Sequence, residues 1–254
     1  MVWLRRGFAI LTLLLIWQIV VWMNVIPPQY LPPVHTAALA LSDMLKSGEL
    51  LEAELVTIYR ALAGLGLTLA LALPLAGLSA ICKPFQAALQ PIAELVRPLP
   101  PAALVPITVF ALGSNMKLYL LVVCLVAMWP TYLSAVAAFE GIEDVLRQTG
   151  RSFGCNRLQL LRDVLFPQAL PAIFVGIRIS ASISLIAVVV AEMLGGHSGL
   201  GHLLFQKAFA VRVPDVFAIT LICGLNGMVF NQGVNLVKNY VCGWHTQFRA
   251  EATA

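Results

Sequence analysis

Long apolar stretches alternate with short polar segments along almost the whole chain. Six of these stretches are nearly free of charged side chains. A helix needs about 20 apolar residues to cross the roughly 30 Å hydrocarbon core of a membrane. The pattern therefore predicts six membrane-spanning helices, at about 7–26, 58–82, 99–113, 118–138, 170–194 and 216–237.

The third predicted span is short and rich in proline. Four prolines lie at or within it: Pro98, Pro100, Pro101 and Pro106. Proline lacks a backbone N–H and its ring clashes with the preceding turn of a helix. We therefore expect this span to be kinked, or to pack inside the bundle.

Composition excludes a soluble protein. Of the 254 residues, 60% are hydrophobic and only 11% are charged, and the mean hydropathy is +0.89. A soluble domain of this length needs more polar surface. The fold class predicted is an all-α membrane protein with one transmembrane domain over residues 1–254. The five cysteines and four histidines show no metal-ligand spacing, so we expect no metal site.

Lysine and arginine are distributed unequally between the two sides of such a bundle. If the N-terminus is inside, the inner segments hold ten: Arg5, Arg6, Lys83, Arg97, Arg147, Arg151, Arg157, Arg162, Lys238 and Arg249. The outer segments hold four: Lys46, Lys117, Lys207 and Arg212. Cytoplasmic loops are enriched in these residues, which predicts that both termini are cytoplasmic. A cleaved signal peptide at the first span is the alternative.

A polar island runs from Gln148 to Pro167, within a predicted cytoplasmic loop at 139–169. Leucines recur in it at three- and four-residue spacing, which predicts two short helices joined by a turn near Gly154. Glycine suits that turn because it adopts left-handed backbone angles at little cost. Pro167 is expected at the start of the next membrane helix, where a missing N–H costs nothing.

The spacing within this island resembles a known motif. Gly154 is followed by Val164-Leu165-Phe166-Pro167 in the register of the "EAA" loop of binding-protein-dependent ATP-binding-cassette (ABC) importer permeases. Where that family usually has Glu-Ala-Ala, this chain has Gln148-Thr149-Gly150. The segments 97–106, 191–195 and 198–201 also resemble the nitrate, sulfonate and taurine branch of these permeases.

The resemblance implies a type I ABC importer permease fold in a multi-pass protein of the bacterial inner membrane. It also implies a homodimer that works with two ABC ATPase subunits and a periplasmic or lipid-anchored binding protein, surrounded by membrane lipid and without nucleic acid. The imported solute would be small and anionic, of the nitrate, sulfonate or taurine type. The residues that would couple the loop to the ATPase are Gln148, Arg151, Ser152, Phe153, Gly154, Arg157, Leu158 and Pro167.

The chain contains no GxxxxGK[ST] phosphate-binding loop. We therefore expect no cofactor in this chain, with ATP and Mg²⁺ bound by the partner ATPase. On this interpretation the chain is a transport subunit and not an enzyme.

Four polar residues of the fifth span are candidates for a pathway or a gate: Arg178, Ser180, Ser184 and Glu192. A charge at the bilayer centre costs about 2.5–3.5 kcal/mol on the insertion scale, so Arg178 is expected to pair within the bundle or to contact an anionic substrate. Serines within spans more often pack helices together than line a pathway. For Glu192, a hydrogen-bonding role at the helix end competes with substrate contact.

Two alternative functions are open at this level. An ion-gradient-driven secondary transporter would need ionisable residues in mid-membrane and repeated halves. An intramembrane serine protease is suggested by Gly196-His197-Ser198-Gly199 with His202 nearby. Such short matches occur readily in a glycine-rich outer turn.

Overall fold

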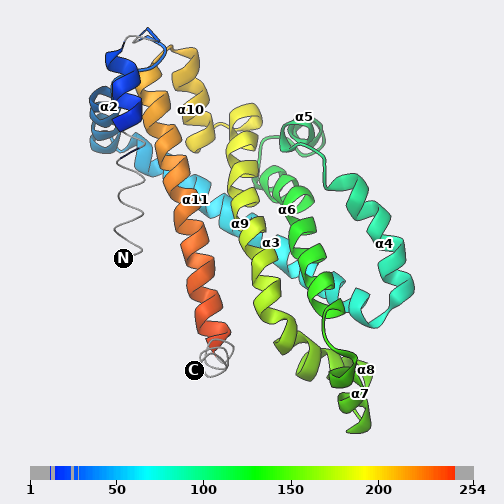
Figure 1. The fold of residues 1–254 in the computed structure, drawn as a ribbon. Coiled ribbons are helices and arrows are strands. Elements are labelled where there is room, and N and C mark those ends of the chain that lie inside the picture. Colours follow the sequence, from blue (N-terminus) through cyan, green and yellow to red (C-terminus); the bar gives the residue numbers. More distant parts are fainter. Residues whose placement is uncertain (1–11, 13–14, 24–25, 28, 244–254) are drawn as a thin grey trace.

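The computed structural model describes residues 12, 15–23, 26–27 and 29–243, and in these residues all regular structure is helical. The named helices are α2 (Val34–Lys46), α3 (Glu49–Ile81), α4 (Lys83–Val96), α5 (Pro101–Leu112), α6 (Met116–Glu140), α7 (Asp144–Ser152), α8 (Arg157–Gln159), the π-helical turn η1 (Leu160–Leu165), α9 (Phe166–Gly195), α10 (Leu200–Phe209) and α11 (Val213–Val241). Figure 1 shows α7 and α8 at one end of the bundle and α2, α5 and α10 at the other. These ends are called the α7 end and the α10 end below.

Four helices of the described part are long and apolar enough to cross a membrane: Glu49–Ile81, Met116–Glu140, Arg157–Gly195 and Val213–Val241. They contain the fourth, fifth and sixth predicted spans and all of the second except Cys82, and each extends beyond the predicted bounds at one end or both. The extra residues form helical turns with polar or charged side chains, so a search for uncharged apolar stretches leaves them out. The first predicted span, 7–26, lies partly outside the described residues, of which 15–22 are helical. The total of six spans and the position of the termini stay predictions.

The third predicted span differs from the structure. The predicted span at 99–113 corresponds to α5 alone, and the helix α4 before it was not predicted. The axes of α4 and α5 are bent by 99° at a short break, and only together are the two helices long and apolar enough for one span. The break coincides with Pro98, Pro100 and Pro101, where missing N–H groups and restricted preceding residues end a helix. In Figure 1, α4 leads back from the end of α3 toward the α10 end, where α5 lies across the bundle.

The fifth span also begins earlier than predicted. Pro167 does not start the membrane helix, because a continuous helix of 39 residues runs from Arg157 to Gly195. The π-helical turn at Leu160–Leu165 immediately precedes Phe166 and Pro167. A proline ring clashes with the carbonyl group four residues before it in a regular α-helix. The wider π turn gives room for this ring, so the helix continues through the proline.

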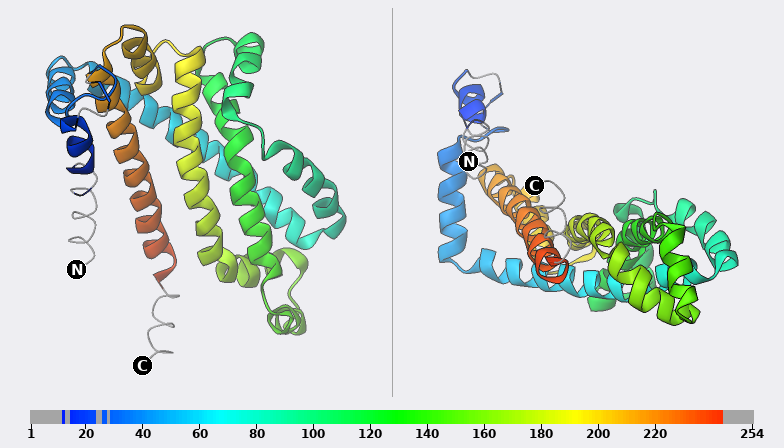
Figure 2. Two further views of the ribbon diagram at one scale, coloured as in Figure 1. Left: turned by 45° about the horizontal axis from the view of Figure 1, so that its top comes forward. Right: turned by 60° about the horizontal axis from the view of Figure 1, so that its bottom comes forward.

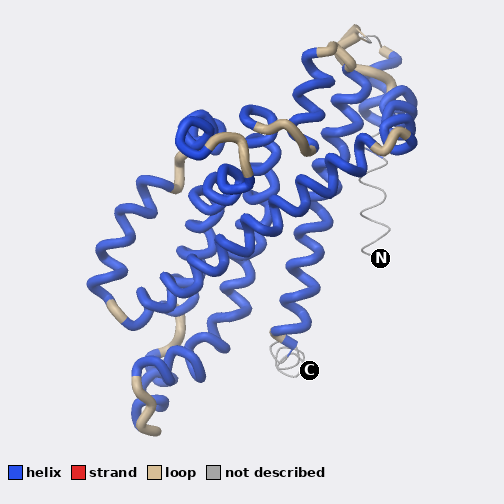
Figure 3. The backbone as a smooth tube through the Cα atoms, turned by 180° about the vertical axis from the view of Figure 1, so that it is seen from behind, coloured by secondary structure: helices blue, strands red, loops and turns tan. Residues whose placement is uncertain are grey.

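The core is a stack of three apolar clusters along the bundle. The cluster nearest the α7 end joins α6 and α9 with the loop helices, and includes Tyr132, Phe139 and Leu165. The middle cluster joins α3, α5, α6 and α9. The third cluster joins α2, α10 and the first turns of α3 and α11. Figures 2 and 3 show the resulting arrangement, with α3 crossing the other long helices obliquely and α11 at one side.

Candidate functional site

The predicted coupling loop folds as a helix, a tight turn and a second helix. Gly154 has φ of +80° and lies in the left-handed region, as the sequence predicts. The N–H of Cys155 donates to Gly150 O at 3.1 Å, and the N–H of Gly154 donates to Arg151 O at 2.9 Å. This pair of bonds is the Schellman arrangement that ends a helix at glycine. A Cβ at Gly154 would meet no atom within 4 Å, so backbone conformation alone requires the glycine.

The second helix is fixed at its start by Asn156. The Asn156 side chain accepts a hydrogen bond from the N–H of Gln159 at 2.8 Å, and the Gln159 side chain accepts one from the N–H of Asn156 at 2.9 Å. This reciprocal capping box satisfies two N–H groups at the helix start. Our sequence reasoning missed it, although Asn followed three residues later by Gln is a visible signal. The two helices therefore meet at a defined angle.

Two further residues hold α7 against the bundle, and neither was predicted. A Cβ at Gly150 would lie 2.6 Å from Leu160 Cδ1, so a larger residue here would require the Leu160 side chain to move. Arg147 donates to Phe139 O at the end of α6, and its Nε lies 3.9 Å from Asp144 Oδ1. Gly150 stands where the EAA pattern has alanine, and here it serves close packing.

Most of the predicted coupling residues are exposed at the α7 end. Phe153 is 83% exposed and Leu158 is 67% exposed, although both are large apolar side chains outside the spans. The exposed polar members are Gln148, Arg151, Ser152 and Arg157. Pro167 is partly buried at the base of the same helix. The structure thus brings these residues together in α7, α8, the turn between them and the start of α9. Their role in coupling stays a prediction.

A second polar site lies at the α10 end, around Glu192. The Glu192 side chain is 0% exposed. One of its carboxylate oxygens lies 2.7 Å from Arg60 Nη1. The other accepts hydrogen bonds from Thr57 Oγ1 at 2.8 Å and from the N–H of Gly201 at 3.0 Å. Three donors therefore compensate the burial of this carboxylate.

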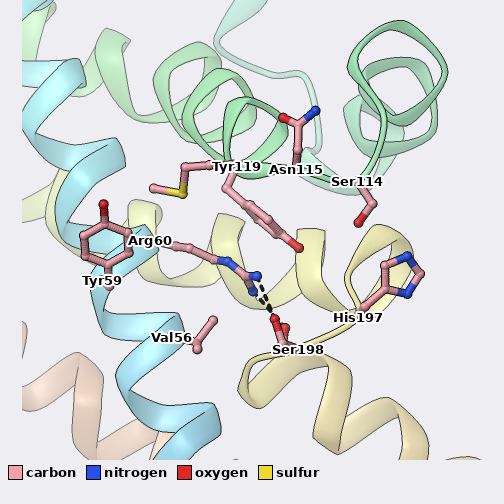
Figure 4. A pocket seen from close by; sticks show the side chains of 9 residues that line it. Val56, Tyr59, Arg60, Ser114, Asn115, Tyr119, His197 and Ser198 are labelled. Carbon is pink, nitrogen blue, oxygen red and sulfur yellow. Dashed lines mark hydrogen bonds between the residues drawn. The ribbon is translucent and has the colours of Figure 1, made fainter.

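Arg60 connects this carboxylate with the turn that follows α9. Its Nη1 donates to Ser198 O and its Nη2 donates to Ser198 Oγ, both at 2.8 Å. Its guanidinium carbon also lies 3.9 Å from the centre of the Tyr119 ring. Figure 4 shows Arg60 extending between Tyr119 and Ser198 in a cavity of about 430 Å³. The arrangement fixes the 196–201 turn on α3 and α6.

The remaining pathway candidates occupy different environments. Ser180 is buried between α9 and α6, where it bonds to Thr131 Oγ1 at 2.8 Å and donates to Ala127 O at 2.6 Å. Ser184 is also buried and donates to Ala181 O of its own helix. Arg178 is exposed on α9, and its Nε donates to Asn231 Oδ1 of α11 at 3.1 Å. Of the four candidates, Arg178 alone is exposed. The pathway role of all four residues stays a prediction.

The arrangement expected of a serine protease is not found in the described residues. The Ser198 hydroxyl oxygen accepts from Arg60, and no hydrogen bond in that part of the chain joins it to His197 or His202. The two imidazole rings lie edge to face, with their centres 6.5 Å apart and their planes at 70°. General-base activation of a serine requires a histidine within hydrogen-bond reach.

Comparison with known proteins decides the family. The family model for the binding-protein-dependent transport system inner membrane component matches residues 65–241, which include α6, the loop helices, α9 and α11. This chain belongs to that family. The match confirms the resemblance drawn from the EAA-like loop, although this chain has Gln148-Thr149-Gly150 in place of Glu-Ala-Ala.

Similar proteins support the assignment of this chain, called the permease below, to that family. It is 27% identical to the putative aliphatic sulfonates transport permease of Bacillus subtilis, over 97% of this chain and 89% of that protein. It is 30% identical to the taurine transport permease of Escherichia coli, over 62% of this chain and 57% of that protein. A subunit of the MetNI methionine ABC transporter, solved in an inward-facing conformation, is 16% identical and gives a TM-score of 0.69, over 77% of this chain and 97% of that one.

These comparisons settle the general class of the permease. It is the membrane subunit of an ABC importer, with the all-α type I permease fold, and a multi-pass membrane protein. The matched proteins are transport subunits rather than enzymes. The secondary-transporter and protease interpretations are therefore replaced by the importer.

Proposed function

We propose that the permease forms the membrane pathway of an ATP-driven importer in the bacterial inner membrane, for a small solute of the sulfonate, taurine or nitrate type. Two copies would assemble with two ABC ATPase subunits and would receive solute from a periplasmic or lipid-anchored binding protein. ATP and Mg²⁺ would be bound by the ATPase. The similarity to sulfonate and taurine permeases supports this choice of solute class.

The observation that carries the proposal is the exposed apolar pair at the α7 end. Phe153 and Leu158 are exposed on a segment that a Schellman turn and a capping box hold rigid. Burial of an exposed Phe side chain in a partner groove stabilises a complex by about 1.5–3 kcal/mol. Because the second helix of the loop is continuous with α9, movement of this pair would be transmitted directly to a membrane span.

Support for a second copy comes from an apolar groove between α3, α9 and α11. The groove has a volume of about 550 Å³, and its lining includes Leu62, Phe174 and Val229. Asn226, also in its lining, donates to Glu54 Oε2 at 3.0 Å. Polar groups inside a membrane usually face protein or a water-filled path rather than lipid. A second permease subunit would cover such a surface.

The test of the ATPase interaction is quantitative co-purification. Tagged permease is purified from its native membranes, and the accompanying ABC ATPase is measured by mass spectrometry for the wild type and for Phe153→Ala and Leu158→Ala. We expect each variant to lose about tenfold or more of the ATPase, as the burial energy of these side chains implies. Phe209→Ala is the matched control, since Phe209 is 74% exposed at the α10 end. Equal ATPase recovery in all four proteins would contradict the proposal.

The solute class needs a separate test. The purified complex and its binding protein are placed in liposomes, and ATP-dependent uptake of an alkanesulfonate, taurine and nitrate is measured. We expect uptake of at least one of these solutes, and none without ATP. Uptake of an unrelated solute with full ATP dependence would overturn the solute class and leave the ATPase interaction standing.

A further inference from the structure

A second cavity lies at the α7 end, between the α3–α4 junction and the loop helices. Its volume is about 500 Å³. Its lining includes four cationic residues, Lys83, Arg147, Arg151 and Arg157, and no carboxylate. Arg151 and Arg157 are also predicted coupling residues, but the proposed transport cycle gives no role to Lys83, to Arg147 or to the cavity itself.

The positive charge of this cavity is only partly balanced by its surroundings. Lys83 lies 2.9 Å from Glu140 Oε1, and Arg147 lies at the outer limit of an ion pair with Asp144, at 3.9 Å. Among the described residues, Arg151 and Arg157 have no ion pair. Four cations around one cavity repel one another unless an anion lies between them. Arginine in particular offers a planar set of donors that matches a phosphate group.

One wall of the same cavity is apolar. Ile81, Leu160 and Leu165 line it, at the level where α3 and the long α9 helix reach the end of their apolar segments. The first turn of α4 contributes to the cavity as well, and its N-cap residue Cys82 makes no side-chain capping bond. The positive end of the α4 dipole is therefore directed at this region. A ligand that fits has a phosphate on one side and apolar groups on the other.

We propose that this cavity binds the phosphate of an anionic phospholipid head group from the adjoining membrane leaflet. The phosphate lies among Lys83, Arg147, Arg151 and Arg157, and the glycerol end of the lipid lies along Ile81 and Leu165. A bound lipid would contact both the α3–α4 junction and the loop helices, and would stabilise their relative positions. The proposal goes beyond the transport function and does not depend on the identity of the solute.

The test uses the full-length permease purified in detergent, without the ATPase. Native mass spectrometry measures retention of phosphatidylglycerol, of phosphatidylcholine and of inorganic phosphate, each added alone and in competition. We expect phosphatidylglycerol to bind about tenfold or more tightly than phosphatidylcholine. We also expect Lys83→Gln and Arg147→Gln each to weaken its binding about tenfold, the loss typical of one charge-assisted hydrogen bond.

Arg162→Gln is the matched control. Arg162 lies on the same helix as Leu160, is 87% exposed in its side chain and does not line the cavity. Its substitution should leave lipid binding unchanged. Arg147→Gln could fail to fold because the bond to Phe139 O is lost. Lys83→Gln then tests the proposal alone, since the Lys83 side chain is 68% exposed and its substitution should leave the fold intact.

Three results of this experiment would overturn the proposal, and a fourth would come from a separate measurement on the complex with the ATPase. The first is equal retention of the anionic and the zwitterionic lipid. The second is equal loss of phosphatidylglycerol in Arg162→Gln and in Lys83→Gln. The third is binding of inorganic phosphate without lipid, which would assign the cavity to a free anion. Complete displacement of the lipid by the assembled ATPase would likewise overturn it, by showing that the cavity is a protein contact.

Discussion

Arg60 on α3 and Glu192 on α9 form an ion pair with 2.7 Å between Arg60 Nη1 and Glu192 Oε1, in which the carboxylate is fully buried and the guanidinium partly buried. The same guanidinium donates to Ser198, and the same carboxylate accepts from Gly201. The pair thus joins two long helices and fixes the turn between α9 and α10. This turn lies at the end of the bundle opposite the proposed ATPase contact, where solute would be received.

We expect Arg60→Leu to destabilise the permease strongly. The variant leaves the Glu192 carboxylate buried with fewer donors, and breaking a buried pair from one side typically costs about 3–5 kcal/mol. Thermal unfolding of the detergent-solubilised protein measures the effect. Arg178→Leu is the control, because Arg178 is exposed and, among the described residues, its side chain bonds to Asn231 alone. Equal melting temperatures for the two variants would show that the pair is dispensable.

Gly199→Ala should disrupt the same site for a steric reason. A Cβ at Gly199 would lie 2.1 Å from Glu192 Oε1, and the residue has φ of +99°. The carboxylate would have to move, and its bonds to Thr57 and Gly201 would be lost. We expect a marked loss of folded protein by size-exclusion chromatography. Gly66→Ala, which meets no atom within 4 Å, should be recovered like the wild type, and similar recovery of both variants would argue against this packing.

Substitution of Gly154 should affect coupling rather than insertion. Gly154→Val places a β-branched residue at φ of +80°, which costs about 1–2 kcal/mol or more. We expect the turn to rearrange, Phe153 to move and ATPase co-purification and transport to fall, while the amount of membrane-inserted permease is unchanged. Gly154→Asn should retain more activity, because asparagine tolerates this conformation better. Full transport by Gly154→Val would show that the turn is not part of the coupling device.

Asn156→Ala should loosen the start of the long helix. Loss of an N-cap side chain costs about 1 kcal/mol, and here the bond to the Gln159 N–H is removed. Hydrogen exchange of residues 157–160 should become faster by about fivefold. Asn156→Asp keeps an acceptor and should exchange like the wild type. Unchanged exchange in Asn156→Ala would mean that packing, and not the cap, fixes this end.

Orientation is tested with reporter fusions. The ten-to-four distribution of Lys and Arg predicts that fusions after Ser152 and at the C-terminus report a cytoplasmic position and that fusions after Gly48 and Gly201 report the outside. In the structure, α7 lies at one end of the bundle and α2 and α10 lie at the other. A reporter on the outside after Ser152 would be incompatible with an ATPase contact at Phe153.

Local features of this protein could be predicted from the sequence because their causes are local. Apolar length predicts the spans at 58–82, 118–138, 170–194 and 216–237, since a helix in lipid satisfies its own backbone. Gly154 is predictable because left-handed backbone angles favour glycine wherever the turn lies. The EAA-like register indicated the family, which the match over residues 65–241 confirms.

Only the tertiary structure decided features that depend on distant residues. Arg60 and Glu192 are 132 positions apart, and nothing in either local sequence indicates the other. The 99° bend between α4 and α5 and the continuous helix through Pro167 are also tertiary results. Proline restricts a helix, but the neighbouring packing determines whether the chain breaks, bends or widens into a π turn. The sequence therefore determined the membrane class and the turn at Gly154, whereas packing between distant helices determined the buried charge pair and the path of the chain at its prolines.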